Sequence, residues 1–222
     1  MATGKAFIAY PSNLREVKDA IAATTVKIKK LQPTLQLHPW EPNDIPGRCL
    51  VDPIVDTIIA CDFVVADISR LNFNVVYEVG FAIGKRKRVI LLRNKAIRRD
   101  ERLARETGIF DTIGYQDYAN SDDLVSYLVE LSDLSPLPLK QILPNRRAPI
   151  YIVLPRESTE AEIRLISRVK KEARLFFRSF DPQEHLRMSV RDAIDNVSAS
   201  LGVILPLISS NRNDSQIHNL HC

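Results

Sequence analysis

The side chains best suited to chemistry lie in residues 61–92, CDFVVADISRLNFNVVYEVGFAIGKRKRVILL. Asp67 ends a short apolar run in this stretch, and Glu78 follows inside a longer apolar pattern. An ordinary carboxylate is ionised at pH 7. We expect one carboxylate of this stretch, near the mouth of an apolar crevice, to do the chemistry of the chain.

A strand, a helix and a second strand must position these carboxylates. Residues 63–66 and 89–92 are short apolar runs, typical of buried strands. Between them an apolar stripe with spacings of three and four predicts a helix packed on a sheet: Val75, Val76, Val79, Ala82 and Ile83. A βαβ unit of this kind predicts a parallel sheet, whose ligands bind beyond the carboxyl ends of the strands. Residues 67–70 would lie at that edge.

The surrounding segments complete an α/β domain over residues 1–135. A strand at 7–10 precedes a helix at 14–31, which Ser12 or Asn13 can cap. The remaining elements follow in order: a strand at 35–37, a loop at 38–48 that could line the ligand crevice, a helix beginning at Asp52 and Pro53, a charged segment at 98–106, an edge strand at 112–115 and a closing helix from 121.

Composition excludes several classes of protein. The 222 residues are 45% hydrophobic, enough for one large domain or two small ones. A net charge of +4, spread along the chain, is too weak to indicate a nucleic-acid partner. No apolar run approaches the ~18 residues of a membrane span, and the first residues lack a signal-peptide pattern. Lys85-Arg86-Lys87-Arg88 is better explained by a helix C-terminus than by a nucleic-acid patch.

Cysteine and histidine usage argues against disulfides, metals and cofactors. The three cysteines (Cys49, Cys61 and Cys222) form no CxxC pair and leave one unpaired, which predicts a reducing, cytoplasmic setting. The histidines at 185, 218 and 221 do not combine with Cys222 into a recognised zinc spacing. We expect neither a metal nor a cofactor.

A second, degenerate copy of the domain is predicted over 150–222, after a proline-rich linker at 136–149. When the sequence is aligned with itself at a constant shift of 140 residues, Asp52 aligns with Asp192. Glu78 aligns with His218, so the second copy has no carboxylate at that position. Two unrelated α/β segments are the alternative. The copy ends where its last helix would begin, which leaves open a longer natural protein or a partner that completes the sheet.

The segments 60–67, ACDFVVAD, and 77–85, YEVGFAIGK, resemble the nucleoside 2-deoxyribosyltransferase family and the related 2'-deoxynucleoside 5'-phosphate N-hydrolases. TIR domains that cleave NAD are more distantly similar. The resemblance covers about a third of the chain well and implies a flavodoxin-like or Rossmann-like parallel sheet with helices on both faces. In these families a glutamate attacks the anomeric carbon and expels the base, and Glu78 matches its position. The covalent route passes through an oxocarbenium-like transition state.

The resemblance also implies a set of supporting residues. Asp52 would orient the nucleophile or the leaving base, although it can equally be a helix cap. Substrate contacts would come from the loops at the sheet edge: Tyr10, Asp67, Ser69, Asn72 and Asn74. Arg70 would bind a phosphate or be solvated. Each of these residues also has a purely structural explanation. Glu78 could form a salt bridge on the helix surface, and Asn72 and Asn74 could stabilise the turn itself. Gly80 and Gly84 could allow close packing of the helix on the sheet.

Three functions follow as hypotheses. The first is an N-glycosidase or glycosyltransferase acting on a nucleoside, nucleotide or NAD-like molecule, with the second copy packed on the first as a pseudo-dimer. The second is a non-catalytic nucleotide sensor within a longer protein. The third is a TIR-like interaction domain without a ligand; bacterial proteins of that kind often act in antiphage defence. We expect no membrane partner and do not expect nucleic acid; a homo-oligomer or a further C-terminal domain stays open.

Overall fold

The computed structural model describes residues 3–43, 51–70, 72–97, 113–131, 134–138, 142–153, 160–174, 176–180 and 190–204. The chain divides into two compact units, Met1–Pro138 and Leu139–Cys222. The division falls inside the proline-rich stretch at 136–149. Each unit is described by itself below.

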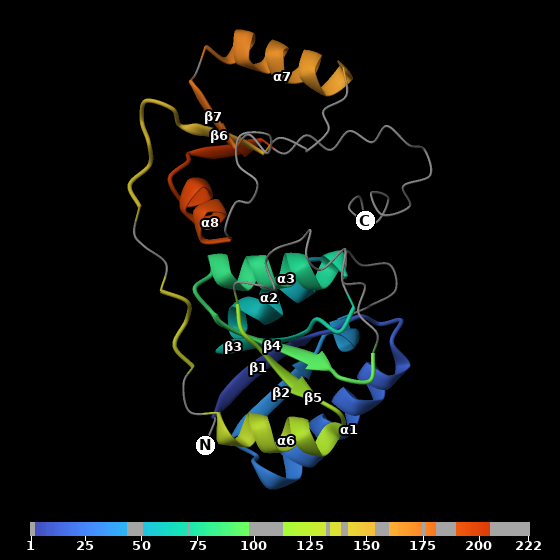
Figure 1. The fold of residues 1–222 in the computed structure, drawn as a ribbon. Helices are drawn as coiled ribbons and strands as arrows, with labels where there is room; N and C mark the ends of the chain where they lie inside the picture. The colour runs from blue at the N-terminus through green and yellow to red at the C-terminus, as the bar shows by residue number, and fades with distance from the viewer. Residues whose placement is uncertain are drawn as a thin grey trace. The chain divides into compact units, whose positions relative to one another are not determined.

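The first unit contains a parallel sheet with the strand order β2-β1-β3-β4-β5 (Figure 1). Its strands are β1 (Gly4–Ala9), β2 (Leu35–Pro39), β3 (Phe63–Asp67), β4 (Arg88–Asn94) and β5 (Tyr115–Tyr118). This order is that of flavodoxin-like folds. The predicted α/β class, with a flavodoxin-like parallel sheet, is therefore confirmed.

Helices cover both faces of this sheet (Figure 1). On one face lie α1 (Arg15–Leu31) and α6 (Ser121–Glu130), which contact each other and share a hydrophobic core with alternate residues of the strands. The other face is covered by α2 (Val51–Ala60) and α3 (Phe73–Gly84). A short 3-10 helix, η1 (Glu41–Asn43), follows β2. In the described helices, none combines the length and hydrophobicity needed to cross a membrane.

The second unit contains a smaller parallel sheet with the order β7-β6-β8. Its elements are β6 (Ile150–Val153), α7 (Glu160–Ala173), β7 (Phe177–Phe180), α8 (Val190–Ser198) and β8 (Gly202–Ile204). The arrangement is the same as β2-β1-β3, with helices between the strands. In register, Leu37 lies beside Ala6 and Phe177 beside Ile150. The outer strands of the two sheets therefore correspond at a shift of 140, whereas the strands beside them correspond at a shift of 144, so the shift is not constant. Origin by duplication stays a prediction, and His218, which the shift matches to Glu78, lies outside the described residues.

Several local predictions differ from the structure. The edge strand begins at Tyr115, after most of the segment predicted at 112–115, and the charged segment at 98–106 lies outside the described residues. Neither Ser12 nor Asn13 caps α1, because the N-cap is Leu14, which makes no side-chain hydrogen bond there. Gly80 and Gly84 do not serve close packing, since both are exposed and a Cβ at either would meet nothing within 4 Å.

The basic run after α3 has a structural explanation. Lys87 donates hydrogen bonds from Nζ to the carbonyls of Ile59 and Cys61, at 2.7 and 2.6 Å. These carbonyls lie at the C-terminal end of α2, where a cation offsets the partial negative charge of the helix. The prediction that this basic run serves a helix C-terminus therefore holds for Lys87. The helix end that Lys87 contacts is that of α2, not that of α3, which precedes it in the sequence.

Candidate functional site

The carboxyl ends of β1 and β3 form the place where this fold binds ligands. In the order β2-β1-β3-β4-β5 the first connection runs to one side of β1 and the next connection runs to its other side. Open α/β sheets commonly bind ligands beyond the strand ends where the order reverses in this way. Ala9 pairs with Ala66 in register, so Tyr10 and Asp67 are the next residues at the same level of the sheet. Tyr10 and Asp67, two of the predicted substrate-binding residues, therefore follow the ends of adjacent strands.

Asp67 and Ser69 belong to a buried network of polar side chains. Tyr118 donates its hydroxyl hydrogen to Oδ2 of Asp67 at 2.6 Å, and the backbone N–H of Ser69 donates to Oδ1 at 3.0 Å. The hydroxyl of Ser69 in turn accepts a hydrogen bond of 2.7 Å from the backbone N–H of Asn94. All four side chains are buried. These contacts join the ends of β3, β4 and β5, so they position the loops at the sheet edge.

Burial raises the pKa of Asp67, and the hydrogen bonds from Tyr118 and Ser69 act in the opposite direction. Burial also raises the pKa of Tyr118, and the charge of Asp67 adds to that effect. Both groups are thus held in a low-dielectric environment and are paired with each other. A ligand-binding role for the Asp67 carboxylate would require this pair to open.

A second group of side chains lies at the ends of β1 and β2. The hydroxyl of Tyr10 donates to the carboxylate of Glu41, which also forms an ion pair of 3.1 Å with Lys18. Burial raises the pKa of Glu41. The rings of Tyr10 and Trp40 pack at 6.2 Å. Tyr10 is therefore anchored at the predicted edge, by partners that were not among the predicted site residues.

Two nitrogens beside this group are buried without a described hydrogen-bond partner: Nε2 of His38 and Nε1 of Trp40. Buried polar atoms are normally paired, so such groups call for an acceptor or donor from outside the described chain. Sequence reasoning placed Trp40 and Glu41 in a loop that could line the crevice without assigning them a role. The signal that could have found them is their position directly after a strand end.

Glu78 lies on the inner face of α3, together with Val75, Val79 and Ala82. It is 5% exposed, and no hydrogen bond or ion pair to it is found among the described residues. Burial raises its pKa to about 8. The surface salt-bridge alternative is therefore wrong, and burial favours the protonated carboxyl over the ionised form that an ordinary glutamate adopts at pH 7. Tyr77, which precedes it, is exposed and stacks on Phe81.

The position of Glu78 along α3 places it close to the predicted edge. It comes five residues after Phe73, where α3 begins, which corresponds to roughly 7 to 8 Å along the helix axis. Side chains of helical residues lean toward the N-terminus of their helix, here toward the carboxyl end of β3. Helix geometry thus directs the side chain of Glu78 toward the carboxyl edge of the sheet, and the residue as a whole is buried.

The remaining predicted site residues have simpler roles. Asn72 is the N-cap of α3, and its Oδ1 accepts hydrogen bonds from the backbone N–H groups of Asn74 and Val75. The turn interpretation therefore holds for Asn72, while the side chain of Asn74 is exposed. Asp52 is exposed within the first turn of α2 rather than ahead of it, so it is not the N-cap. Arg70 is exposed beside the edge.

The structure brings some predicted residues together and separates others. Tyr10 and Asp67 share one sheet edge, and Asp67 contacts Ser69 directly. No hydrogen bond or ion pair within the described ranges links Glu78 to Asp52 or Asp67. Asp67 is bonded to Tyr118, a member of the core on the α1 and α6 face, whereas Glu78 belongs to α3 on the opposite face.

The described residues offer no cluster of three or more histidine, cysteine or acidic side chains that could hold a metal ion. Cys61 is buried and unpaired, and burial is the main cause that raises its pKa to about 11. It is therefore a protonated thiol at neutral pH, without the character of a nucleophile.

Comparison with known proteins gives little guidance. No family model matches the chain, and no curated protein matches it. A solved structure described as a conserved protein from Enterococcus faecalis V583 is similar at 15% identity and a TM-score of 0.42, over 58% of this chain and 99% of that one. A likeness this distant says nothing about function. A proposal of function for this chain therefore rests on the sheet edge and on Glu78.

Proposed function

We propose that the first unit cleaves the N-glycosidic bond of a nucleoside, nucleotide or NAD-like molecule, by hydrolysis or by transfer of the glycosyl group. Glu78 would attack the anomeric carbon, form a glycosyl ester and release the base, and water or a second base would then resolve the ester. The observation that carries the proposal is the buried carboxyl of Glu78, which has no partner among the described residues.

The physical argument begins with the cost of burying a carboxyl group. Such a group is retained in a fold when it has a function or a partner, and strongly perturbed carboxyls are concentrated at functional sites. A carboxylate in a low-dielectric pocket also stabilises the positive charge that develops on the sugar in an oxocarbenium-like transition state.

The residues at the ends of β1 and β2 suit the rest of such a substrate. Trp40 is half-buried and presents an aromatic ring next to Tyr10, and stacking on aromatic rings is a common way to hold a nucleobase. Arg70 is exposed at the end of β3, where its guanidinium is available for a phosphate. These roles are part of the proposal.

The test is the release of free base from NAD and from a panel of nucleosides and 5'-mononucleotides. Wild type is compared with Glu78→Gln, which keeps the shape of the side chain and removes the nucleophile. Glu130→Gln, at an exposed position of α6, is the matched control. We expect release by wild type and Glu130→Gln, and none by Glu78→Gln.

Equal release by all three proteins would show that the activity does not depend on Glu78. If no protein releases a base while one compound of the panel still binds, the non-catalytic sensor replaces the enzyme as the best account of this edge.

A further inference from the structure

The outer face of α3 carries no acidic or basic side chain between Phe73 and Gly84. The one such residue of the helix, Glu78, is buried on the inner face. A helix that is apolar on all sides is normally covered on all sides, whereas a helix at a free surface has a polar outer face. The helix α1 follows the second pattern, with exposed charged residues along its length: Arg15, Glu16, Lys18, Asp19, Lys29 and Lys30. The outer face of α3 thus has the composition of an interface.

Aromatic side chains and glycines share this face. Phe73 is 45% exposed and Tyr77, one helical turn later, is 51% exposed. The ring of Tyr77 stacks on that of Phe81 in the next turn, with 6.2 Å between the ring centroids. Gly80 and Gly84 follow Tyr77 by three and seven residues, which places them on the same side of the helix, and a Cβ at either would meet nothing within 4 Å. The rings therefore project beside two open notches in the helix surface.

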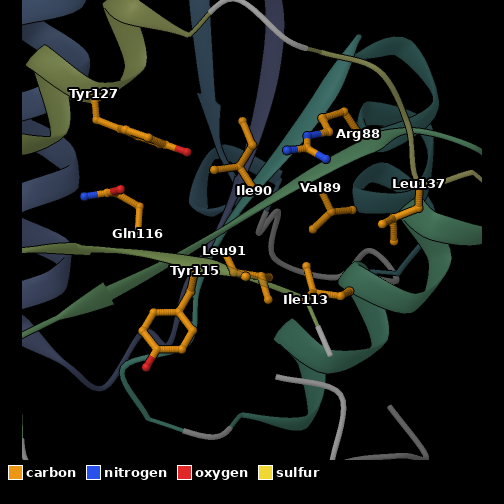
Figure 2. Close-up of a pocket in the computed structure, with 10 residues that line it drawn as sticks. Arg88, Val89, Ile90, Leu91, Ile113, Tyr115, Gln116, Tyr127 and Leu137 are labelled. Atoms are coloured by element: carbon orange, nitrogen blue, oxygen red, sulfur yellow. The ribbon is translucent and has the colours of Figure 1, made fainter. Parts of the chain in front are cut away.

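The cations nearest to this face lie at the C-terminal end of α3. Lys85 and Arg86 follow the helix directly and are exposed, and Nζ of Lys85 lies over the ring of Phe81 at 5.4 Å. Lys87 is engaged by the carbonyls at the end of α2. Figure 2 shows Arg88 among the side chains that line a pocket of about 340 Å³ beside β4. Lys85 and Arg86 are therefore the members of the basic run that remain for an outside partner.

The acidic side chains beside this face lie toward the opposite end. The helix α2 contacts α3, and both connect parallel strands, so they run in the same direction. The exposed Asp52 and Asp56 of α2 thus lie toward the N-terminal end of α3, where they outnumber the exposed Arg70. Asp62, beyond the C-terminal end of α2, already accepts a hydrogen bond from the backbone N–H of Lys5. The two ends of the face therefore differ in charge.

We propose that a second molecule of this chain docks on this face, with the two α3 helices antiparallel about a two-fold axis. An axis midway between residues 80 and 81 places Tyr77 over Gly84 of the second molecule and, at the same time, Phe81 over its Gly80. The same axis brings the basic end of each molecule to the acidic end of the other. Two-fold dimers require a self-complementary surface of this kind, and aromatic side chains with a charged rim are typical of interfaces. The proposal does not rest on the proposed function.

Sedimentation equilibrium of the full chain measures the association. The face is small, so we expect a weak dimer that forms above about 10 µM and dissociates near ~1 µM, where Gly80 lies in open space. Gly84→Leu fills a notch and Tyr77→Ser removes a ring, and each should weaken dimerisation at least about tenfold. Ala22→Leu and Val26→Ser, at exposed positions of α1, are the matched controls and should associate like wild type.

Charge reversal tests the antiparallel arrangement. The variant with Lys85→Glu and Arg86→Glu has two acidic ends, and the variant with Asp52→Lys and Asp56→Lys has two basic ends. Each variant alone should dimerise at least about tenfold more weakly than wild type, because like charges meet at both ends of the interface. An equal mixture of the two should recover the wild-type affinity, because every basic end then meets an acidic one.

Wild type that stays monomeric at about 300 µM would overturn the proposal and leave the face to a different macromolecule. Dimerisation that is unchanged in Gly84→Leu and Tyr77→Ser would also overturn it, because the contact would then lie elsewhere on the chain. If the two charge-reversed variants do not recover on mixing, the antiparallel pairing is wrong, and the proposal with it.

Discussion

The hydroxyl of Tyr118 donates a 2.6 Å hydrogen bond to the carboxylate of Asp67, and so connects the ends of β5 and β3 across the intervening β4. Ser69 adds a contact to β4 through the backbone of Asn94. Every side chain in this network is buried, which makes the hydrogen bonds strong and their loss expensive. The edge strand of the sheet is therefore held at its carboxyl end by polar groups rather than by apolar contacts alone.

The first prediction concerns this bond. Tyr118→Phe removes the donor and leaves an oxygen of Asp67 buried without it, which should lower the free energy of unfolding by about 1 to 3 kcal/mol. Urea denaturation at pH 7 measures the change. Tyr115→Phe is the control, because Tyr115 is exposed. The substitution removes only its hydroxyl group and keeps the ring, over which Arg93 lies. Equal stability of the two variants would show that the Tyr118 bond contributes nothing.

The second prediction follows from the pKa of Glu78, which burial raises to about 8 from an ordinary value of 4.5. The folded protein keeps the proton up to about pH 8, whereas the unfolded chain releases it above 4.5. Glu78 therefore adds stability that is fully present below pH 4.5 and is lost as the pH rises through 8. The difference amounts to at most ~5 kcal/mol.

Glu78→Gln has no such proton, so its stability should not show this decline. The measurement is the free energy of unfolding of both proteins at pH 5 and at pH 9. Wild type should lose several kcal/mol relative to Glu78→Gln between these values, up to the ~5 kcal/mol above. Comparing the two proteins cancels the contribution of Asp67, whose pKa is also raised. Parallel pH profiles would mean that Glu78 titrates normally and is solvated.

The third prediction contrasts two glycines. Gly4 has a φ of 113°, and a Cβ there would lie 2.4 Å from Oδ2 of Asp62, the oxygen that accepts the hydrogen bond from the backbone of Lys5. Gly4→Ala should therefore destabilise the protein by about 1 kcal/mol or more. Gly80 is exposed within α3 and has open space around it, so Gly80→Ala should stabilise by about 0.5 to 1 kcal/mol.

Thermal denaturation of both glycine variants tests this pair. The melting temperature should fall for Gly4→Ala and rise for Gly80→Ala. A fall in both cases would show that the surface of α3 around Gly80 is covered in solution, because an added methyl group is harmless only in open space.

Hydrophobic periodicity was enough to predict the sheet, since apolar runs at 63–66 and 89–92 correspond to β3 and β4. It could not predict the Asp67 network, because Tyr118 lies far along the chain and only the folded sheet brings it to β3. Periodicity also failed to predict that the carboxyl of Glu78 is buried. A glutamate on a helix is usually solvated, and only the packing of α3 shows that its carboxyl is desolvated. For the two glycines, the sequence carried no information on their neighbours.

The fourth prediction joins the pKa of Glu78 to its proposed role. A nucleophile must be deprotonated, so kcat/KM for base release should rise as the pH increases through about 8 and level off above it. Glu78→Gln should be inactive throughout. The limiting slope on the acidic side should be one, as expected for a single proton.

The opposite profile would identify a different chemistry on the same residue. A general acid must carry its proton, so activity that falls above pH 8 would make Glu78 the donor to the leaving base and leave the nucleophile to be found elsewhere. A profile without an inflection near 8 would contradict the desolvated state of Glu78 itself. The measurement thus separates the role of the carboxyl from its environment. The stability profile of wild type relative to Glu78→Gln then decides which of the two is wrong, because the difference between the proteins reports the same proton without any substrate.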